Sequence, residues 1–198
     1  MTQSISPSTK RLLTFEEFLA YEEDSDTRYE LVGGELIEMP TESNENNRIA
    51  RGLFLELAKL IPLALLAHKD TEVEVSGRRA TCRIPDLLVH TETSAAALSG
   101  AKRSIITHEM PSPALVIEIV SPGSANRIRD YRYKRTEYGA RGIAEYWIID
   151  PEERRITICE WVDGQYEDTV FVGETRIVST VIPEFRLTVE QLLAFAQS

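Results

Sequence analysis

Two apolar segments, each interrupted by a single acidic residue, constrain the fold of this chain more than any other feature. The first covers residues 81–89 and contains Asp86, and the second covers residues 114–120 and contains Glu118. Both have the length and apolar character of buried strands. A lone carboxylate in an apolar strand is costly unless another group compensates it. We therefore expect a partner or a cation beside each of them.

The composition is that of a globular protein of 198 residues, with 42% hydrophobic and 27% charged residues and a net charge of −10. A chain of this length can bury a sizeable core. We expect a single domain over 12–198, preceded by a disordered polar tail over 1–11. The negative charge argues against non-specific adhesion to nucleic acid or anionic membranes, although it is compatible with a local basic groove.

The sequence offers no sign of export or membrane insertion. Residues 1–10 are polar and lack the apolar core of a secretory signal, and no apolar run reaches membrane-spanning length. Cys82 and Cys159 fall in strand-like segments without zinc-ligand spacing, so we expect buried reduced thiols. These features predict a cytoplasmic protein.

Local signals predict helices and strands in mixed order. Thr14 with Glu17 predicts a capped helix to about Tyr21, and Gly33-Gly34 predicts a hairpin within 28–39. Apolar periodicity predicts a helix over 43–61. Further along we expect a strand within 63–75, an irregular connection over 92–113, a helix over 126–138, a strand over 144–150, a hairpin formed by 156–162 and 166–172, a strand near 177–181 and a helix over 188–196.

Asp86 and Glu118 are candidates for a magnesium site. Magnesium usually takes one or two protein carboxylates and completes its shell with water and phosphate. Such a metal would neutralise charge that develops on a phosphate. The alternative is that each carboxylate caps a loop or pairs with an arginine, and the residue types alone favour this alternative.

The helix expected over 126–138 carries Asp130, Lys134 and Tyr138 four residues apart, hence on one face. One interpretation brings the Lys134 ammonium to the metal site, where it would orient a nucleophile and stabilise the phosphate transition state. The other is a solvated helix with one Asp–Lys pair. Neighbouring arginines would hold backbone phosphates under the first interpretation: Arg127, Arg129, Arg132 and Arg135. Glu30, in the first hairpin, is either a third acidic ligand or a solvent-facing strand residue.

The ordered set of motifs resembles the Uma-two family of endonucleases, in the PD-(D/E)XK, restriction-endonuclease-like superfamily. The resemblance runs from about Leu13 to Leu193. Its pieces are RYELVGGEL over 28–36, Pro85-Asp86, EIVSP over 118–122, the spacing of Asp130, Lys134 and Tyr138, and EYWIIDP over 145–151.

The resemblance implies an α/β restriction-endonuclease-like fold, with a central mixed sheet flanked by helices and an additional C-terminal hairpin. It also implies metal-dependent phosphodiester hydrolysis with Mg²⁺ or Mn²⁺ as cofactor. Asp86 and Glu118 fall on the metal-binding acids, Glu30 on the acid before the core, and Lys134 on the catalytic lysine. Lys134 is displaced from the strand, because Val120 occupies the usual E-x-K position.

This chain departs from the family at the start of the long helix, where relatives carry a histidine and this sequence has Asn46 or Asn47. Asparagine can form hydrogen bonds but cannot titrate. We therefore expect at most a substrate-positioning role for Asn46, as for Asp130, Tyr138 and Arg127.

Two functional hypotheses follow from these observations. The first is an endonuclease that acts on DNA, in which Asp86 and Glu118 bind metal, and Glu30 and Lys134 complete the catalytic set. A homodimer is expected with it, because cutting both strands of a duplex suits two sites. The alternative is a catalytically inactive nuclease-fold protein that serves as a nucleic-acid-binding or assembly module.

Overall fold

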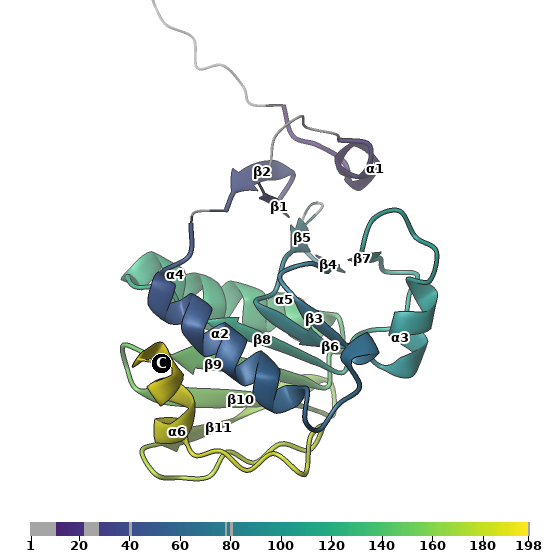
Figure 1. The fold of residues 1–198 in the computed structure, drawn as a ribbon. Helices are drawn as coiled ribbons and strands as arrows, with labels where there is room; N and C mark the ends of the chain where they lie inside the picture. Colours follow the sequence, from purple (N-terminus) through teal and green to yellow (C-terminus); the bar gives the residue numbers. More distant parts are fainter. Residues whose placement is uncertain (1–10, 22–27, 40, 78, 80, 198) are drawn as a thin grey trace, which may run out of the picture.

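The computed structural model describes residues 11–21, 28–39, 41–77, 79 and 81–197. The expected disordered tail over 1–11 lies almost wholly outside these residues, of which Arg11 is the first. The fold consists of two mixed β-sheets, with helices on both faces of the larger one (Figure 1).

The larger sheet has six strands in the order β11-β10-β9-β8-β6-β3. β8 and β9 run parallel, and the other neighbours run antiparallel. In the order of the sheet, the strands are Gln165–Val172, Arg155–Val162, Glu145–Asp150, Leu115–Ile119, Leu87–Val89 and Leu66–His68. The predicted C-terminal hairpin therefore extends this sheet at one edge, and Asp163-Gly164 forms its turn with positive φ at both residues.

The smaller sheet has five strands in the order β2-β1-β5-β4-β7. β4 and β7 run parallel, whereas the other pairs are antiparallel. In the order of the sheet, the strands are Glu35–Glu38, Tyr29–Val32, Thr81–Arg83, Glu72–Val75 and Ile105–Ile106.

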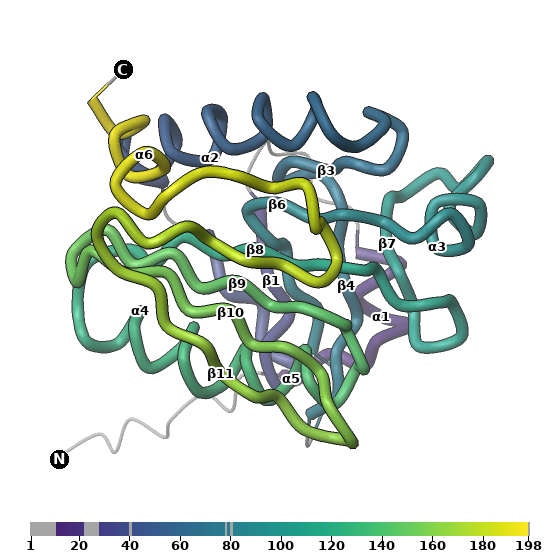
Figure 2. The backbone as a smooth tube through the Cα atoms, turned by 90° about the horizontal axis from the view of Figure 1, so that it is seen from below, coloured from purple at the N-terminus to yellow at the C-terminus, as the bar shows by residue number. Residues whose placement is uncertain are grey.

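Helices cover the two faces of the six-stranded sheet differently. α2 (Asn44–Leu57) and α6 (Val189–Leu193) lie on one face, and α4 (Ser124–Ile128) and α5 (Arg135–Ala140) lie on the other (Figure 2). A π-helix, Arg129–Lys134, joins α4 to α5 without a break. The remaining helical segments are α1 (Phe15–Leu19), α3 (Glu92–Ala97) and the 3₁₀ turns Leu63–Leu65 and Ala194–Gln197.

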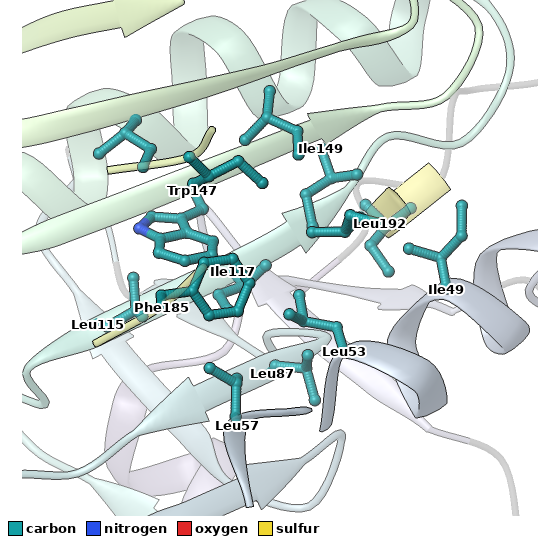
Figure 3. Close-up of a cluster of buried hydrophobic side chains, with 14 of the residues drawn as sticks. Ile49, Leu53, Leu57, Leu87, Leu115, Ile117, Trp147, Ile149, Phe185 and Leu192 are labelled. Carbon is teal, nitrogen blue, oxygen red and sulfur yellow. The ribbon is translucent and has the colours of Figure 1, made fainter. Parts of the chain in front are cut away.

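The face under α2 holds the main apolar core. Leu53 and Leu57 of α2 pack towards Leu87, Ile117 and the ring of Trp147 (Figure 3). On the opposite face the apolar cluster is built partly from tyrosines, with Tyr138 of α5 stacked edge-on against Tyr146. Since strand residues alternate between faces, Glu118 lies on this second face while its neighbours Ile117 and Ile119 lie in the first core.

The predicted strand over 81–89 is wrong, because it is two strands in different sheets. β5 ends at Arg83 in the five-stranded sheet, and β6 begins at Leu87 in the six-stranded sheet. Pro85 cannot donate to a strand ladder, so the pairing stops where the chain crosses between sheets. Asp86 therefore stands at the crossover and not within a strand.

Three other expectations need correction. The helix expected over 126–138 starts at Ser124 and contains the π-helical segment. The helix expected over 43–61 ends at Leu57, with only turns between it and Pro62. Near 177–181 there is no strand in the described chain, only an isolated bridge between Arg176 and Thr188.

The described residues contain no helix that combines the length and the apolar character needed to cross a bilayer.

Candidate active site

The acidic residues singled out above meet in one pocket of about 60 Å³, between β1, the crossover at Asp86, the end of β8 and the π-helix. This is room for a cation and a few waters and not for a nucleobase. Its wall includes Glu30, Glu42, Asp86, Glu118, Arg129 and Lys134. The sequence-predicted set of Glu30, Asp86, Glu118 and Lys134 is thus brought together.

Lys134 is the cation that lies closest to the acidic side chains of the pocket. Its Nζ lies 2.8 Å from Oε1 of Glu118, 3.8 Å from Oε1 of Glu30 and 3.7 Å from Oδ1 of Asp130. Burial alone would lower the pKa of Lys134, but these three carboxylates outweigh it and raise the pKa above its ordinary value. Lys134 therefore stays protonated and acts as a fixed cation.

Glu118 is held from one side only. Its Oε1 accepts hydrogen bonds from the Tyr138 hydroxyl at 2.7 Å and from the ammonium of Lys134. Its Oε2 makes no hydrogen bond with the described residues, and the side chain lines the pocket. Burial raises the pKa of Glu118 to about 8, because the lost hydration outweighs the attraction of Lys134. A carboxylate with a free oxygen and a displaced pKa is a common property of functional sites.

Tyr138 orients Glu118 and does not reach the pocket. It is fully buried, and burial raises the pKa of its hydroxyl well above the ordinary value, so the hydroxyl remains a donor. The structure thus places Tyr138 behind Glu118.

Asp86 is fixed by the neighbouring strand and by a second lysine. Its Oδ2 accepts the backbone N–H of Ile119 at 2.7 Å, which ties the crossover to the end of β8. Its Oδ1 lies 3.0 Å from Nζ of Lys69. Lys69 enters from the turn between β3 and β4 with φ of +56°, a conformation uncommon for a lysine and one that clusters at functional sites.

Glu30 is part of a buried charge chain. Its Oε2 accepts from Nη1 of Arg83 at 2.8 Å, and the guanidinium of Arg83 also forms two hydrogen bonds with the carboxylate of Glu137 on α5. Burial alone would raise the pKa of Glu30, but Lys134 and Arg83 outweigh it and lower the pKa. Glu30 is therefore ionised, yet both of its oxygens already face cations or N–H donors.

Asn46 acts on the pocket by holding the side chain of Glu42. The Asn46 side-chain amide donates to Oε1 of Glu42 at 2.9 Å and lies near the carbonyl oxygens of Ile119 and Val120. The Ser121 hydroxyl donates to the same Glu42 oxygen at 3.1 Å. Asn46 is buried and so acts on the pocket wall, while Glu42 is exposed to the pocket itself.

Arg127 lies outside this pocket. Its guanidinium donates to both oxygens of Asp150, at 3.1 and 3.3 Å, and forms ion pairs with Glu152 and Glu153. The structure does not bring Arg127 together with the other predicted site residues.

The donor chemistry of the pocket fits a hard divalent cation. Asp86 and Glu118 offer carboxylate oxygens, the ligands that Mg²⁺ prefers, and Oε2 of Glu118 is free to coordinate. Among the described residues, no three His, Cys, Asp or Glu side chains form a ready metal cluster. Two protein carboxylates are the usual contribution to a magnesium shell completed by water and phosphate.

Comparison with protein families gives a match over nearly the whole chain. The Uma2 family model, described as "Putative restriction endonuclease", matches residues 15–190. The chain belongs to the Uma2 family. A comparison with curated proteins found no match.

The fold of this Uma2 chain is also that of a solved structure. The crystal structure of a protein from Anabaena variabilis, titled a putative nuclease belonging to DUF820, aligns with a TM-score of 0.70 and 18% sequence identity. The alignment covers 93% of this chain and 99% of that one. The predicted mixed α/β, restriction-endonuclease-like fold is confirmed, with the strands divided between two sheets.

Sequence reasoning missed three charged residues of this Uma2 site, namely Lys69, Arg83 and Glu42. Arg83 lies within the first apolar segment, only three residues before Asp86, so its presence there was a usable signal. Lys69 and Glu42 come from connecting segments whose position depends on how the two sheets meet, and no local pattern marks them.

Proposed function

We propose that this protein is a divalent-metal-dependent nuclease that hydrolyses phosphodiester bonds in DNA. Asp86 and Glu118 are the proposed metal ligands, with Mg²⁺ or Mn²⁺ as cofactor. The observation that carries the proposal is the convergence of these two acids, Glu30 and Lys134 on one pocket, in a member of an endonuclease family.

A bound divalent ion would supply positive charge for the negative charge that develops on the phosphate. Within the chain, Tyr138 and Lys134 fix Oε1 of Glu118, so that Oε2 faces the pocket in a set orientation. Lys134 carries its charge in a desolvated place, where a preorganised ammonium stabilises a phosphate transition state more than it could in water. Glu30 helps to hold this ammonium in position.

The direct test is nicking of supercoiled plasmid in the presence of Mg²⁺ or Mn²⁺, compared with EDTA. We expect metal-dependent nicking by the wild type and its loss in Asp86→Asn. The matched control is Asp163→Asn, which makes the same chemical change in an exposed turn that asparagine tolerates. A wild type that gives no nicking with either metal, or equal nicking in both variants, would contradict the proposal.

One observation favours the alternative of a non-catalytic nucleic-acid-binding or assembly module. Lysines already occupy both candidate metal ligands in this structure, Lys69 at Asp86 and Lys134 at Glu118. Titration with Mn²⁺ separates the two functions. Heat of binding and an upward shift in Tm are expected of the nuclease, whereas neither is expected of an inactive module.

A homodimer remains part of the proposal, because two sites suit cleavage of both strands. β11 forms one edge of the six-stranded sheet and exposes Val170 and Val172. Light scattering coupled to size exclusion tests the dimer directly.

A further inference from the structure

We infer that Arg129 binds a phosphate group of the nucleic-acid backbone at the mouth of this pocket, and that it is a positioning residue for the substrate. The inference deepens the proposed function and rests on it. Four arginines lie in or beside the helix that carries Lys134, and their surroundings differ sharply.

Three of the four arginines do not line the pocket, and two of these three are paired with carboxylates. Arg127 is paired with Asp150 and two glutamates. Arg135 donates to the carboxylate of Asp168 and to the carbonyl of Tyr166. Arg132 is exposed and does not line the pocket.

Arg129 is the arginine of this helix that lines the pocket. Its Nε donates to Oδ1 of Asp130 at 3.1 Å, which fixes the plane of the guanidinium. Nη1 and Nη2 make no hydrogen bond with the described residues, and the side chain is about one-third exposed, at 33%. A guanidinium held at one edge and open at the other matches the two oxygens of a phosphate.

The π-helix explains why Arg129, and not Arg127, shares the pocket with Lys134. In an α-helix, residues five apart are separated by about 140° around the axis. In a π-helix the hydrogen bond joins residues five apart, so that Arg129 and Lys134 lie nearly one above the other. Arg127, two residues earlier in α4, is then turned by about 200° to the other side.

Arg129 shares its acidic partner, Asp130, with Lys134. Asp130 is 1% exposed, and its second oxygen, Oδ2, has no hydrogen-bond partner among the described residues. Arg129 and Lys134 thus share the charge of Asp130 between them. Because Lys134 lies within ion-pair distance of the same Asp130 oxygen, Arg129 is only partly neutralised and can attract a phosphate without a metal.

The test compares Arg129→Gln with Arg132→Gln, which removes the same charge from an exposed position of the same helix. Binding of a short fluorescein-labelled DNA duplex in EDTA is measured by anisotropy at several salt concentrations. We expect Arg129→Gln to weaken binding by about tenfold or more and to reduce the slope of log Kd against log salt by about one. Arg132→Gln should change Kd by no more than about twofold.

Arg129→Lys distinguishes loss of phosphate binding from a purely structural effect. Lysine keeps a cation beside Asp130 but lacks the planar guanidinium that can donate two parallel hydrogen bonds to a phosphate. We expect its Tm to stay near that of the wild type, while its KM for cleavage of the duplex rises and kcat changes less.

If Arg129→Gln and Arg132→Gln give the same Kd and salt slope while the wild type cleaves DNA, the inference fails and the nuclease stands. If the wild type binds but never cleaves, and Arg129→Gln weakens binding, the phosphate site stands and the hydrolase fails. A wild type that neither binds nor cleaves would overturn both.

Discussion

Glu118 and Glu145 are two buried glutamates on adjacent parallel strands of the same sheet, and their surroundings differ completely. Glu145 is fully buried and accepts five hydrogen bonds, shared between its two oxygens. The donors are the indole N–H of Trp147, the hydroxyls of Ser179 and Thr180 and the backbone N–H groups of Thr180 and Val181. Glu118 receives its two contacts on one oxygen and leaves the other open.

The difference separates a carboxylate whose hydrogen-bonding capacity is used up from one that can still bind a ligand. Glu145 fastens the segment 179–181 to the face under α2 and has no coordination capacity left. Glu118, on the opposite face, is oriented but not saturated, which leaves capacity for a ligand. Burial and charge alone would not distinguish the two, whereas a count of satisfied oxygens does.

The largest expected effect is on catalysis by Glu118→Gln. Glutamine keeps the shape and the acceptor for Tyr138 but binds a hard cation far more weakly, so we expect nicking to fall by at least about a thousandfold, or about 4 kcal/mol. At pH 5, close to the pKa of an unfolded glutamate, the unfolding free energy should change by about 1 kcal/mol or less, because a pKa of about 8 keeps Glu118 neutral in the folded protein, as glutamine is. Plasmid nicking and urea unfolding measure the two quantities. Retained nicking would remove Glu118 from the site.

The mirror-image variant is Glu145→Gln. Glutamine replaces one of the two acceptor oxygens of Glu145 with an NH₂ group. The donors that then face this NH₂ group lose their hydrogen bonds, and each unsatisfied buried group costs about 1–3 kcal/mol. We expect unfolding free energy to drop by about 3 kcal/mol and Tm by about 6–12 °C, while kcat at a temperature where the variant is folded stays near wild type. If Glu145→Gln instead abolished nicking without loss of Tm, the contrast between the two glutamates would be wrong.

A smaller effect is the pH dependence of stability without metal. Burial raises the pKa of Glu118 to about 8, against about 4.3 in an unfolded chain. Between these values the folded state holds a proton that the unfolded state has lost, so the unfolding free energy falls as pH rises. From pH 6 to pH 8 the stability of Glu118→Gln should gain about 2 kcal/mol relative to wild type. Urea titrations at both pH values check this, and parallel curves would contradict it.

The smallest expected effect concerns Lys69, whose ammonium lies against the Asp86 oxygen that a metal would use. Lys69→Met removes a competing cation, so we expect the Kd for Mn²⁺ to tighten by about tenfold, or about 1.4 kcal/mol. Lys59→Met, at an exposed pair with Glu56, is the control and should leave Kd unchanged. Calorimetry or electron paramagnetic resonance of Mn²⁺ measures this without reference to activity. Weaker binding in Lys69→Met would mean that Lys69 supports Asp86 instead of competing for it.

Several elements could be predicted from the sequence because their causes are local. Thr14 caps α1 with the expected reciprocal bond to Glu17, and Gly33-Gly34 adopts positive φ in the first hairpin. The family motifs correctly placed the chain in a restriction-endonuclease-like fold. They also selected Asp86, Glu118 and Lys134, which the structure gathers in one pocket.

Other features were decided only by the tertiary structure. The crossover at Asp86, the left-handed turn that carries Lys69 and the π-helical register that exchanges Arg127 for Arg129 all depend on how two sheets and a helix meet. Helical periodicity read from sequence assumes 3.6 residues per turn throughout, and it gives no warning of a segment that departs from this value. Local propensity and pattern therefore determined which segments form strands and helices and which acidic residues are candidates for the site. Packing between elements distant in the chain determined which oxygens are satisfied and which remain open, because a hydrogen bond or ion pair in the interior depends on partners that neighbouring sequence does not contain.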